Sequence, residues 1–291
     1  MAISLIPNLS AVADAYDGFV LDLWGVVHDG HKPYPDAVAC LTALKAAGKR
    51  VVLLSNAPRR AEGVSDAMVA MGIPRDLYDG AVTSGELTWQ AIKTKSDPWH
   101  ARLGKRFIHI GPERDQGLWA GLGLEWHKEV EAAQFVLNTG PWRDEETLAD
   151  FEAVLQDCAN LRLPMICANP DLEVIRGGAR LICAGTLAAR YAELGGDVAY
   201  HGKPFPAAYD ACLGLMALAD RSRILAVGDS LITDIKGAVG AGIDSALVTS
   251  GIHAEELGLA YGEHPDPARL EAACLRLGAM PKLALPAFRW N

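Results

Sequence analysis

Short apolar runs alternate with amphipathic segments along the chain. A segment with helical spacing begins at Pro35 and ends at Gly48, and a second one spans about 60–71. Apolar runs of strand length precede, separate and follow these two segments, at 19–23, 51–54 and 81–84. This alternation is typical of a parallel sheet with crossover helices, so we predict an α/β fold.

The middle of the chain repeats the alternation. Strand-like runs lie at 106–110, 134–138 and 163–168, with helical candidates near 113–121 and 144–160. From about 185 the first pattern resumes, with strands expected at 223–227 and 245–249. We predict a doubly wound, Rossmann-like parallel-sheet core built from residues 1–84 and 176–291, interrupted by an α/β cap domain over residues 85–175.

Composition and charge narrow the class of function. Half of the 291 residues are hydrophobic and 22% are charged, which is typical of a folded chain with a full core. The formal net charge of −9 argues against a nucleic-acid partner, because phosphate backbones recruit basic surfaces. An acidic chain that binds a phosphorylated small molecule needs a metal ion or a few local cations to offset the repulsion.

The six cysteines form no CxxC pair, and we expect buried, reduced thiols. The N-terminus has no basic leader, and no run of about 20 apolar residues is present, so we expect a cytoplasmic protein without membrane contact. The last residues, after about 278, fit either packing on the core or association into a homodimer, and the sequence favours neither.

Carboxylates follow two of the expected strands. Asp22 ends the first strand and precedes Gly25, and Asp229 ends the strand at 223–227, with Asp234 five residues later. Open α/β sheets bind ligands at these strand ends, and acids gathered there repel one another unless a cation such as Mg²⁺ lies between them. Helix capping is the alternative for Asp229 and Asp234.

Groups suited to an anion lie at two further positions. Ser55 and Asn56 follow the strand at 51–54, where a hydroxyl and backbone amides can hold a phosphoryl oxygen, although such residues are also common in loops. Lys203 lies in the segment HGKP and could neutralise both a nucleophile and a phosphate. Arg60 could contact an anionic substrate or only begin a solvated helix.

The order of these motifs resembles the haloacid dehalogenase superfamily, whose four motifs converge on one site at the strand ends. The matching segments are FVLDLWGVVHDG, LLSNAP, TSGE, ANPD, HGKP and GDSLITDIKGA. Lys203 follows Ser55 by 148 positions (203 − 55), with no comparable gap after the first motif. This placement resembles the class IIA, NagD-like phosphatases, whose α/β cap enters after the third core strand.

The resemblance implies a role for each matching residue. Asp22 would attack phosphorus and form an aspartyl-phosphate, Ser55 would bind the transferring group, and Lys203 would stabilise its charge. Mg²⁺ would be bound by Asp22, the backbone carbonyl of Trp24 and Asp229, with Asp234 close by. The implied reaction is hydrolysis of a small phosphorylated metabolite, such as a sugar phosphate.

Trp24 departs from the superfamily's phosphatase motif, in which a second Asp occupies this position. That Asp protonates the leaving group and activates water, whereas indole offers only an N–H donor. Three readings therefore stay open. His28, His31 or Glu86 could substitute; the enzyme could cleave a phosphonate or another bond; or the chain could bind a phosphorylated ligand with little turnover.

Overall fold

The computed structural model describes residues 3–176 and 178–291, and the chain divides into two compact units. The first, called here the core unit, comprises residues 1–55, 65–82 and 203–291. The second, called the inserted unit, comprises residues 56–64 and 83–202. Among the described residues, no helix combines the length and the apolar character needed to cross a bilayer.

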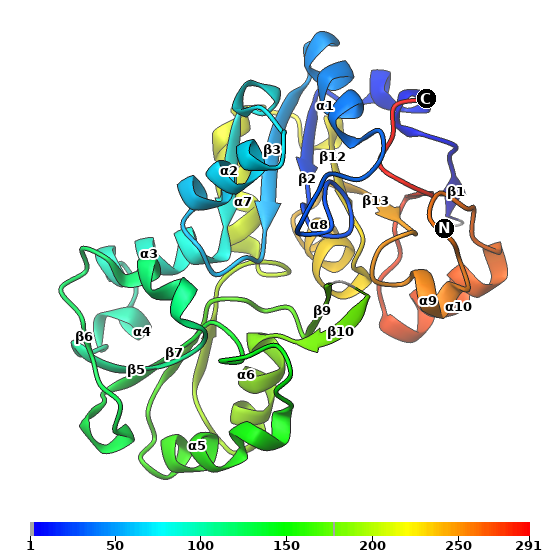
Figure 1. Ribbon diagram of the computed structural model, residues 1–291. Coiled ribbons are helices and arrows are strands. Elements are labelled where there is room, and N and C mark those ends of the chain that lie inside the picture. The colour runs from blue at the N-terminus through cyan, green and yellow to red at the C-terminus, as the bar shows by residue number, and fades with distance from the viewer. Residues whose placement is uncertain (1–2, 177) are drawn as a thin grey trace. The chain divides into compact units, whose positions relative to one another are not determined.

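The core unit is built on a seven-stranded sheet with the strand order β1-β14-β13-β12-β2-β3-β4 (Figure 1). Neighbouring strands pair in parallel all the way from β1 to β3 in this order. The central strands are buried along nearly their whole length, as expected for a sheet covered on both faces. The strands are β1 (Ser4–Leu5), β2 (Gly18–Leu21), β3 (Arg50–Ser55), β4 (Gly80–Thr83), β12 (Ile224–Gly228), β13 (Asp244–Val248) and β14 (Leu283–Leu285).

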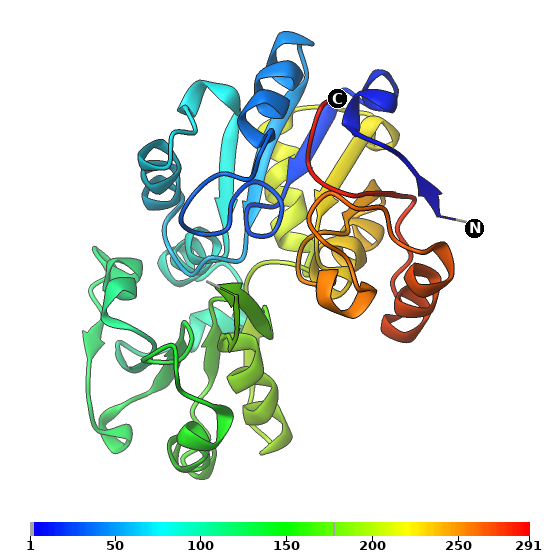
Figure 2. The same cartoon turned by 45° about the vertical axis from the view of Figure 1, so that its right-hand side comes forward.

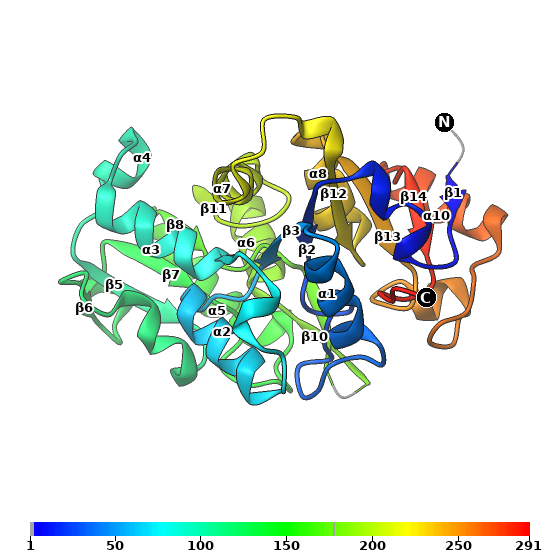
Figure 3. The same ribbon diagram turned by 90° about the horizontal axis from the view of Figure 1, so that it is seen from above.

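Helices cover both faces of the core sheet. Seen from above, α7 and α8 lie on one face and α1 lies on the other (Figure 3). The helices are α1 (Ala37–Ala46), α2 (Ala61–Ala70, whose first turn belongs to the inserted unit), α7 (Pro206–Met216), α8 (Lys236–Gly240), α9 (Ala254–Leu257) and α10 (Pro267–Leu277). This is the doubly wound arrangement that the sequence predicts.

Local sequence sets the ends of these helices, as α10 illustrates. Asp266 accepts a hydrogen bond from the backbone N–H of Arg269, and Pro267 occupies the first helical position, where it needs no donor. Gly278, with φ of 65°, ends the helix in the left-handed conformation. Leu270 and Cys274, one turn apart, then pack into a cluster with β13 and β14 residues.

The inserted unit contains a five-stranded parallel sheet with the order β11-β8-β7-β5-β6 and a separate antiparallel hairpin, β9–β10. Its strands are β5 (Arg106–Ile110), β6 (Glu125–Trp126), β7 (Phe135–Asn138), β8 (Met165–Cys167), β9 (Glu173–Arg176), β10 (Ala179–Ile182) and β11 (Val198–Tyr200). Its helices are α3 (Ser84–Thr94), α4 (Pro98–Ala101), α5 (Leu148–Asn160) and α6 (Ala184–Glu193).

Successive strand residues of the inserted unit pack into two different cores. Ile108 and Val136 join the cluster formed with α5 and α6, whereas Phe107 and Leu137 join the cluster formed with α3. Successive side chains along a strand point to opposite faces of the sheet, so neighbouring residues enter different cores. Both faces of the sheet are therefore apolar, which explains the near-continuous hydrophobic runs in the sequence.

Two expected helices of the middle region differ from the structure. The segment near 113–121 forms a 3₁₀ helix, Glu113–Trp119, because Gly117 lies within it and Gly121 has a positive φ, both unfavourable to an α-helix. The helix expected from 144 begins at Leu148, because Thr147 and Asp150 form a capping box that fixes its start.

The division into units differs from the expected boundaries at both ends of the insertion. Residues 178–202 belong to the inserted unit, not to the core, because β11 pairs with β8 and α6 packs on the same sheet. Residues 56–64 also group with the inserted unit. The hairpin β9–β10 is partly exposed and carries no long apolar run, so its strands escaped the sequence pattern.

The C-terminal residues pack on the core. Strand β14 pairs with β13 and also with the N-terminal strand β1, so both ends of the chain join the same edge of the sheet (Figure 2). Leu283, Ala284 and Leu285 are buried there. Of the two alternatives left open by the sequence, packing on the core is therefore observed for this segment.

Candidate active site

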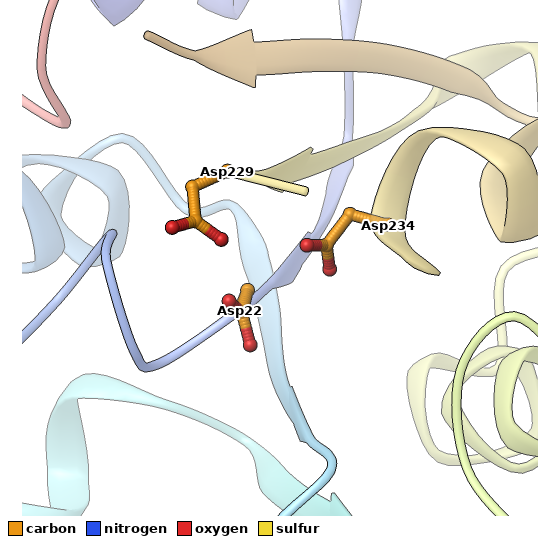
Figure 4. Close-up of side chains that lie close together, drawn as sticks. All are labelled: Asp22, Asp229 and Asp234. Carbon is orange, nitrogen blue, oxygen red and sulfur yellow. The ribbon is translucent and has the colours of Figure 1, made fainter. Parts of the chain in front are cut away.

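Three carboxylates meet at the carboxyl end of the core sheet (Figure 4). Asp22 directly follows β2 and Asp229 directly follows the neighbouring β12, while Asp234 lies in the helical turn Leu231–Ile235. One oxygen from each of them lies within 4.8 Å of the others, and all three side chains are buried. The sequence placed Asp22 and Asp229 on separate strands, and the parallel pairing of these strands brings them together.

Lys203 lies among these acids. Its Nζ donates hydrogen bonds to Oδ1 of Asp22 at 2.6 Å and to Oδ1 of Asp234 at 2.7 Å, and the lysine is only 2% exposed. A buried ammonium group is stable only when it is paired and hydrogen-bonded, and here two carboxylates supply the partners. The HGKP segment thus places its lysine beside the expected nucleophile.

Backbone amides hold the other two carboxylates. Oδ2 of Asp234 accepts a hydrogen bond from the N–H of Ser230 at 3.1 Å, and Oδ2 of Asp229 accepts one from the N–H of Ile252 at 2.8 Å. Both oxygens of Asp234 are therefore engaged, one by Lys203 and one by the backbone. Asp234 can therefore orient Lys203. It also lies close enough to Asp22 and Asp229 to be near a cation held by those two carboxylates.

Two glycines make room for Asp229. A methyl group on Gly25, which has φ of +75°, would lie 1.9 Å from Oδ2 of Asp229, and one on Gly251 would lie 2.2 Å from the same atom. Any larger residue at either position would displace this carboxylate. Gly25 is recognisable in the sequence, because it follows Asp22 closely. The loop of Gly251 and Ile252 was not predicted, since its signal is no more than a glycine shortly after the strand at 245–249.

The electrostatics of the acid cluster favour a cation. Burial raises the pKa of Asp22 well above its ordinary value, the charges of Asp234 and Asp229 raise it further, and Lys203 acts in the opposite direction. Three ionised carboxylates and one ammonium group would carry a formal charge of −2 (−3 + 1). A divalent cation with oxygen ligands would neutralise this charge, so the donor set fits a hard divalent metal ion.

Ser55 is the last residue of β3, which pairs with β2, and it is 2% exposed. It therefore lies at the same sheet edge as Asp22. Asn56 belongs to the inserted unit, where its Nδ2 donates to Asp171 at 2.8 Å and its Oδ1 accepts from Ser84 at 3.1 Å. Through these contacts Asn56 links Asp171 and Ser84 and so has a structural role within that unit.

Arg60 and Glu86 form a pair within the inserted unit. The guanidinium group donates to both carboxylate oxygens of Glu86, at 2.6 and 3.1 Å, and lies 3.8 Å from the ring centroid of Trp89. Hydrogen bonds from Arg60 help to hold the pKa of Glu86 below its ordinary value despite partial burial. Glu86 is thus an ionised partner of Arg60, which is unsuitable for a general acid.

His28 is engaged within its own loop. Its Nδ1 accepts a hydrogen bond from the N–H of Gly30 at 3.0 Å, and burial lowers its pKa to about 4. The ring of Trp24 lies edge-on to it, with 5.5 Å between centroids. A neutral imidazole whose basic nitrogen is occupied is a poor replacement for the missing acid, and His31 is exposed on the same loop.

Two models of known protein families match this chain. A family model described as haloacid dehalogenase-like hydrolase matches residues 19–125, and a related HAD-hydrolase-like model matches residues 200–271. These two segments contain Asp22, Ser55, Lys203, Asp229 and Asp234.

Individual relatives extend the match over nearly the whole chain. Chronophin from Bos taurus is 30% identical over 88% of this chain and 90% of its own length. D-glycerol 3-phosphate phosphatase from Mycobacterium tuberculosis is 28% identical over 84% of this chain, which spans 66% of that relative. A crystal structure of a haloacid dehalogenase-like hydrolase from Brucella suis is 36% identical, with a TM-score of 0.82 and coverage of 97% and 98% of the two chains. The chain therefore belongs to the haloacid dehalogenase-like hydrolase family, in its class IIA, NagD-like group.

Proposed function

We propose that this chain is a Mg²⁺-dependent phosphatase that hydrolyses a small phosphorylated metabolite through a covalent intermediate on Asp22. The observation that carries the proposal is the position of Lys203, which is hydrogen-bonded to Asp22 and Asp234 in the buried acid cluster. The names of the relatives, which include a glycerol phosphate phosphatase, support a small phosphomonoester as substrate.

In the first step, a carboxylate oxygen of Asp22 attacks phosphorus while the bond to the leaving oxygen breaks, and the departing alkoxide takes a proton from solvent. Lys203 lies beside the attacking carboxylate, where its charge offsets the negative charge of the incoming phosphoryl group. Ser55 would hydrogen-bond an equatorial oxygen. Alignment and charge neutralisation are the main demands of phosphoryl transfer, and this set of residues supplies both.

In the second step, water attacks the aspartyl-phosphate, phosphate leaves, and the carboxylate of Asp22 is restored. Splitting one displacement into two lowers the barrier of each. Asp22, Asp229, the backbone carbonyl of Trp24 and the nearby Asp234 would hold Mg²⁺. When bound, the metal ion neutralises charge on the phosphoryl oxygens and aligns them for in-line attack.

Trp24 supports a second candidate function. Because indole cannot donate a proton to the leaving oxygen or accept one from water, phosphoesters of poor leaving groups would react slowly. A bond whose cleavage needs no such proton, including that of a phosphonate with an electron-withdrawing substituent, would suffer less. In the extreme case, the missing proton transfer would make hydrolysis so slow that the chain binds a phosphorylated ligand with little turnover.

The test is Mg²⁺-dependent phosphate release from a panel of metabolite phosphates, phosphonates and p-nitrophenyl phosphate. Asp22→Asn should abolish release from every substrate. Asp29→Asn is the matched control, because Oδ1 of Asp29 accepts hydrogen bonds from the backbone N–H groups of His31 and Lys32, which an asparagine oxygen can also accept. Turnover that survives in Asp22→Asn would refute the covalent mechanism, and turnover of none of these substrates would refute the proposed activity.

A further inference from the structure

A second cluster of titratable side chains lies in the inserted unit, formed by Asp97, His100 and His201. Nε2 of His100 lies 3.0 Å from Nε2 of His201, and Nδ1 of His100 lies 2.6 Å from Oδ2 of Asp97. His100 is 7% exposed and His201 is partly buried. None of the three belongs to the acid cluster of the core unit.

Secondary structure positions both histidines. His100 lies in the short helix α4, whose N-cap Asp97 accepts hydrogen bonds through Oδ1 from the N–H groups of Trp99 and His100. His201 directly follows β11, and its N–H donates to the carbonyl of Cys167 at 3.0 Å. Secondary structure therefore places these two residues side by side, and their side chains bring the two Nε2 atoms together.

The carboxylate decides which nitrogen of His100 carries the proton. Nδ1 faces Asp97 and donates to it, so the neutral ring of His100 presents a bare Nε2 with its lone pair toward His201. A carboxylate behind the distal ring nitrogen is the usual support of a metal-ligating histidine, because it fixes the tautomer and raises the basicity of the ligand atom. His201 supplies the opposing nitrogen.

We propose that Nε2 of His100 and Nε2 of His201 bind a first-row transition metal ion, best represented by Zn²⁺, at a site separate from the Mg²⁺ site. Imidazole ligands favour Zn²⁺, Ni²⁺ and Cu²⁺ over Mg²⁺, which prefers oxygen. Zn–N bonds of about 2.0–2.1 Å at tetrahedral angles need nitrogens about 3.3 Å apart. The observed 3.0 Å has to open by only a few tenths of an ångström, with water completing the coordination.

The protons balance without an external acid or base. In the metal-free pair His201 donates its Nε2 proton to His100; on metal binding that proton moves through solvent to Nδ1 of His201, and its Nε2 becomes a ligand. Burial lowers the pKa of His201 to about 4, so this ring is neutral near pH 7, as ligation requires.

The decisive variant is Asp97→Asn. An asparagine keeps the cap of α4 through its oxygen, but its amide now donates to Nδ1 of His100 and forces the proton onto Nε2. The N–H···N bond to His201 survives with its direction reversed, while the bare ligand nitrogen is lost. We expect Zn²⁺ affinity to fall about 10–100-fold with little change in the melting temperature of the metal-free protein.

Zn²⁺ binding is measured by calorimetry on the full chain after EDTA treatment, in the Asp229→Asn background, which disables the core carboxylate site. His201→Gln, which removes a ligand, should weaken Zn²⁺ binding at least as much as Asp97→Asn does. His127→Gln, which changes a partly exposed histidine of the same unit, should retain the affinity of the Asp229→Asn background. The proposal would be overturned if all these variants bound Zn²⁺ with equal affinity. It would also be overturned if the Asp229→Asn background bound no Zn²⁺. In either case the N–H···N bond between the two histidines would be purely structural.

Discussion

The indole of Trp24 covers the backbone of Gly30. A methyl group on Gly30 would lie 2.0 Å from Cη2 of Trp24, and Gly30 has φ of +91°, which a larger residue adopts only with strain. The loop that follows Asp22, the proposed nucleophile, is thus folded around Trp24, which stands where the superfamily's phosphatases carry their second Asp. Trp24 has a structural role in this loop, and the proton-transfer role of its position is left vacant.

Replacing Trp24 by aspartate should restore that role. We expect Trp24→Asp to increase turnover of alkyl phosphates such as glycerol 3-phosphate by about 10²-fold or more, because a positioned acid/base commonly contributes 10²–10⁴-fold. Turnover of p-nitrophenyl phosphate should rise less, since nitrophenolate leaves without a proton. The ratio of kcat values for the two esters, measured with saturating Mg²⁺, reports the change.

Trp24→Asn is the matched control, because it removes the same indole without adding an acid. Both variants should melt at a lower temperature than the wild type, since each loses the packing of a large, partly buried ring against Gly30 and His28. If Asp and Asn variants showed the same ratio of kcat values, the acid would have to come from elsewhere in the site or from the substrate.

Asp229 and Asp234 should respond differently to the same substitution. Both oxygens of Asp234 are engaged by Lys203 and Ser230, whereas Asp229 follows the strand adjacent to Asp22 and is fixed by Ile252. We expect Asp229→Asn to raise the Mg²⁺ concentration for half-maximal activity by at least 10-fold more than Asp234→Asn does. Asp234→Asn should instead raise KM, because it loosens Lys203. Equal Mg²⁺ requirements in the two variants would contradict this division of roles.

Gly251 should be essential for activity although it carries no functional group. The Cβ of an alanine there would lie 2.2 Å from Oδ2 and 2.3 Å from Cβ of Asp229, so the carboxylate must move. A displacement of about 1 Å can cost 10²-fold in rate, and we expect a loss of that order in kcat for Gly251→Ala. Gly240→Ala is the control, since its added methyl group would meet no atom within 4 Å. Full activity in Gly251→Ala would show that Asp229 tolerates the shift.

The sequence predicted the core sheet well because its strands are apolar on both faces and end in glycine or polar residues. Asp22, Asp229 and Lys203 lie far apart in the chain, yet their positions after strands, or within a recognisable motif, were enough to place them in one site. The exact partners of Lys203 could not be predicted, because they depend on the helical turn that brings Asp234 back toward β12.

Several side-chain contacts of the structure could not be predicted from the sequence. The tautomer of His28 follows from the loop that returns Gly30 to its Nδ1, and the pairing of Arg60 with Glu86 follows from the packing of α3. His100 and His201 are 101 residues apart and meet only because β11 joins the sheet of the inserted unit. The boundary of the insertion was misplaced for the same reason, since β11 is short and only partly buried.

His28 should make the stability of the protein depend on pH. Burial lowers its folded-state pKa to about 4, against about 6.5 in an unfolded chain, so the unfolded state binds more protons between these values. The stability associated with the neutral ring is fully present above about pH 6.5 and is lost as the pH falls toward 4. Its loss by pH 4.5 should be roughly 2–3 kcal/mol.

His28→Asn tests this linkage, because the asparagine oxygen can still accept the N–H of Gly30 but does not titrate. Urea unfolding at pH 7 and pH 4.5 should show the variant less stable than the wild type at pH 7, through lost packing against Trp24. At pH 4.5 this deficit should shrink by roughly 2–3 kcal/mol or reverse. His264→Asn, which alters an exposed histidine, should follow the wild type at both pH values. A constant difference between His28→Asn and wild type would mean that the loop opens and solvates His28 before the ring is protonated.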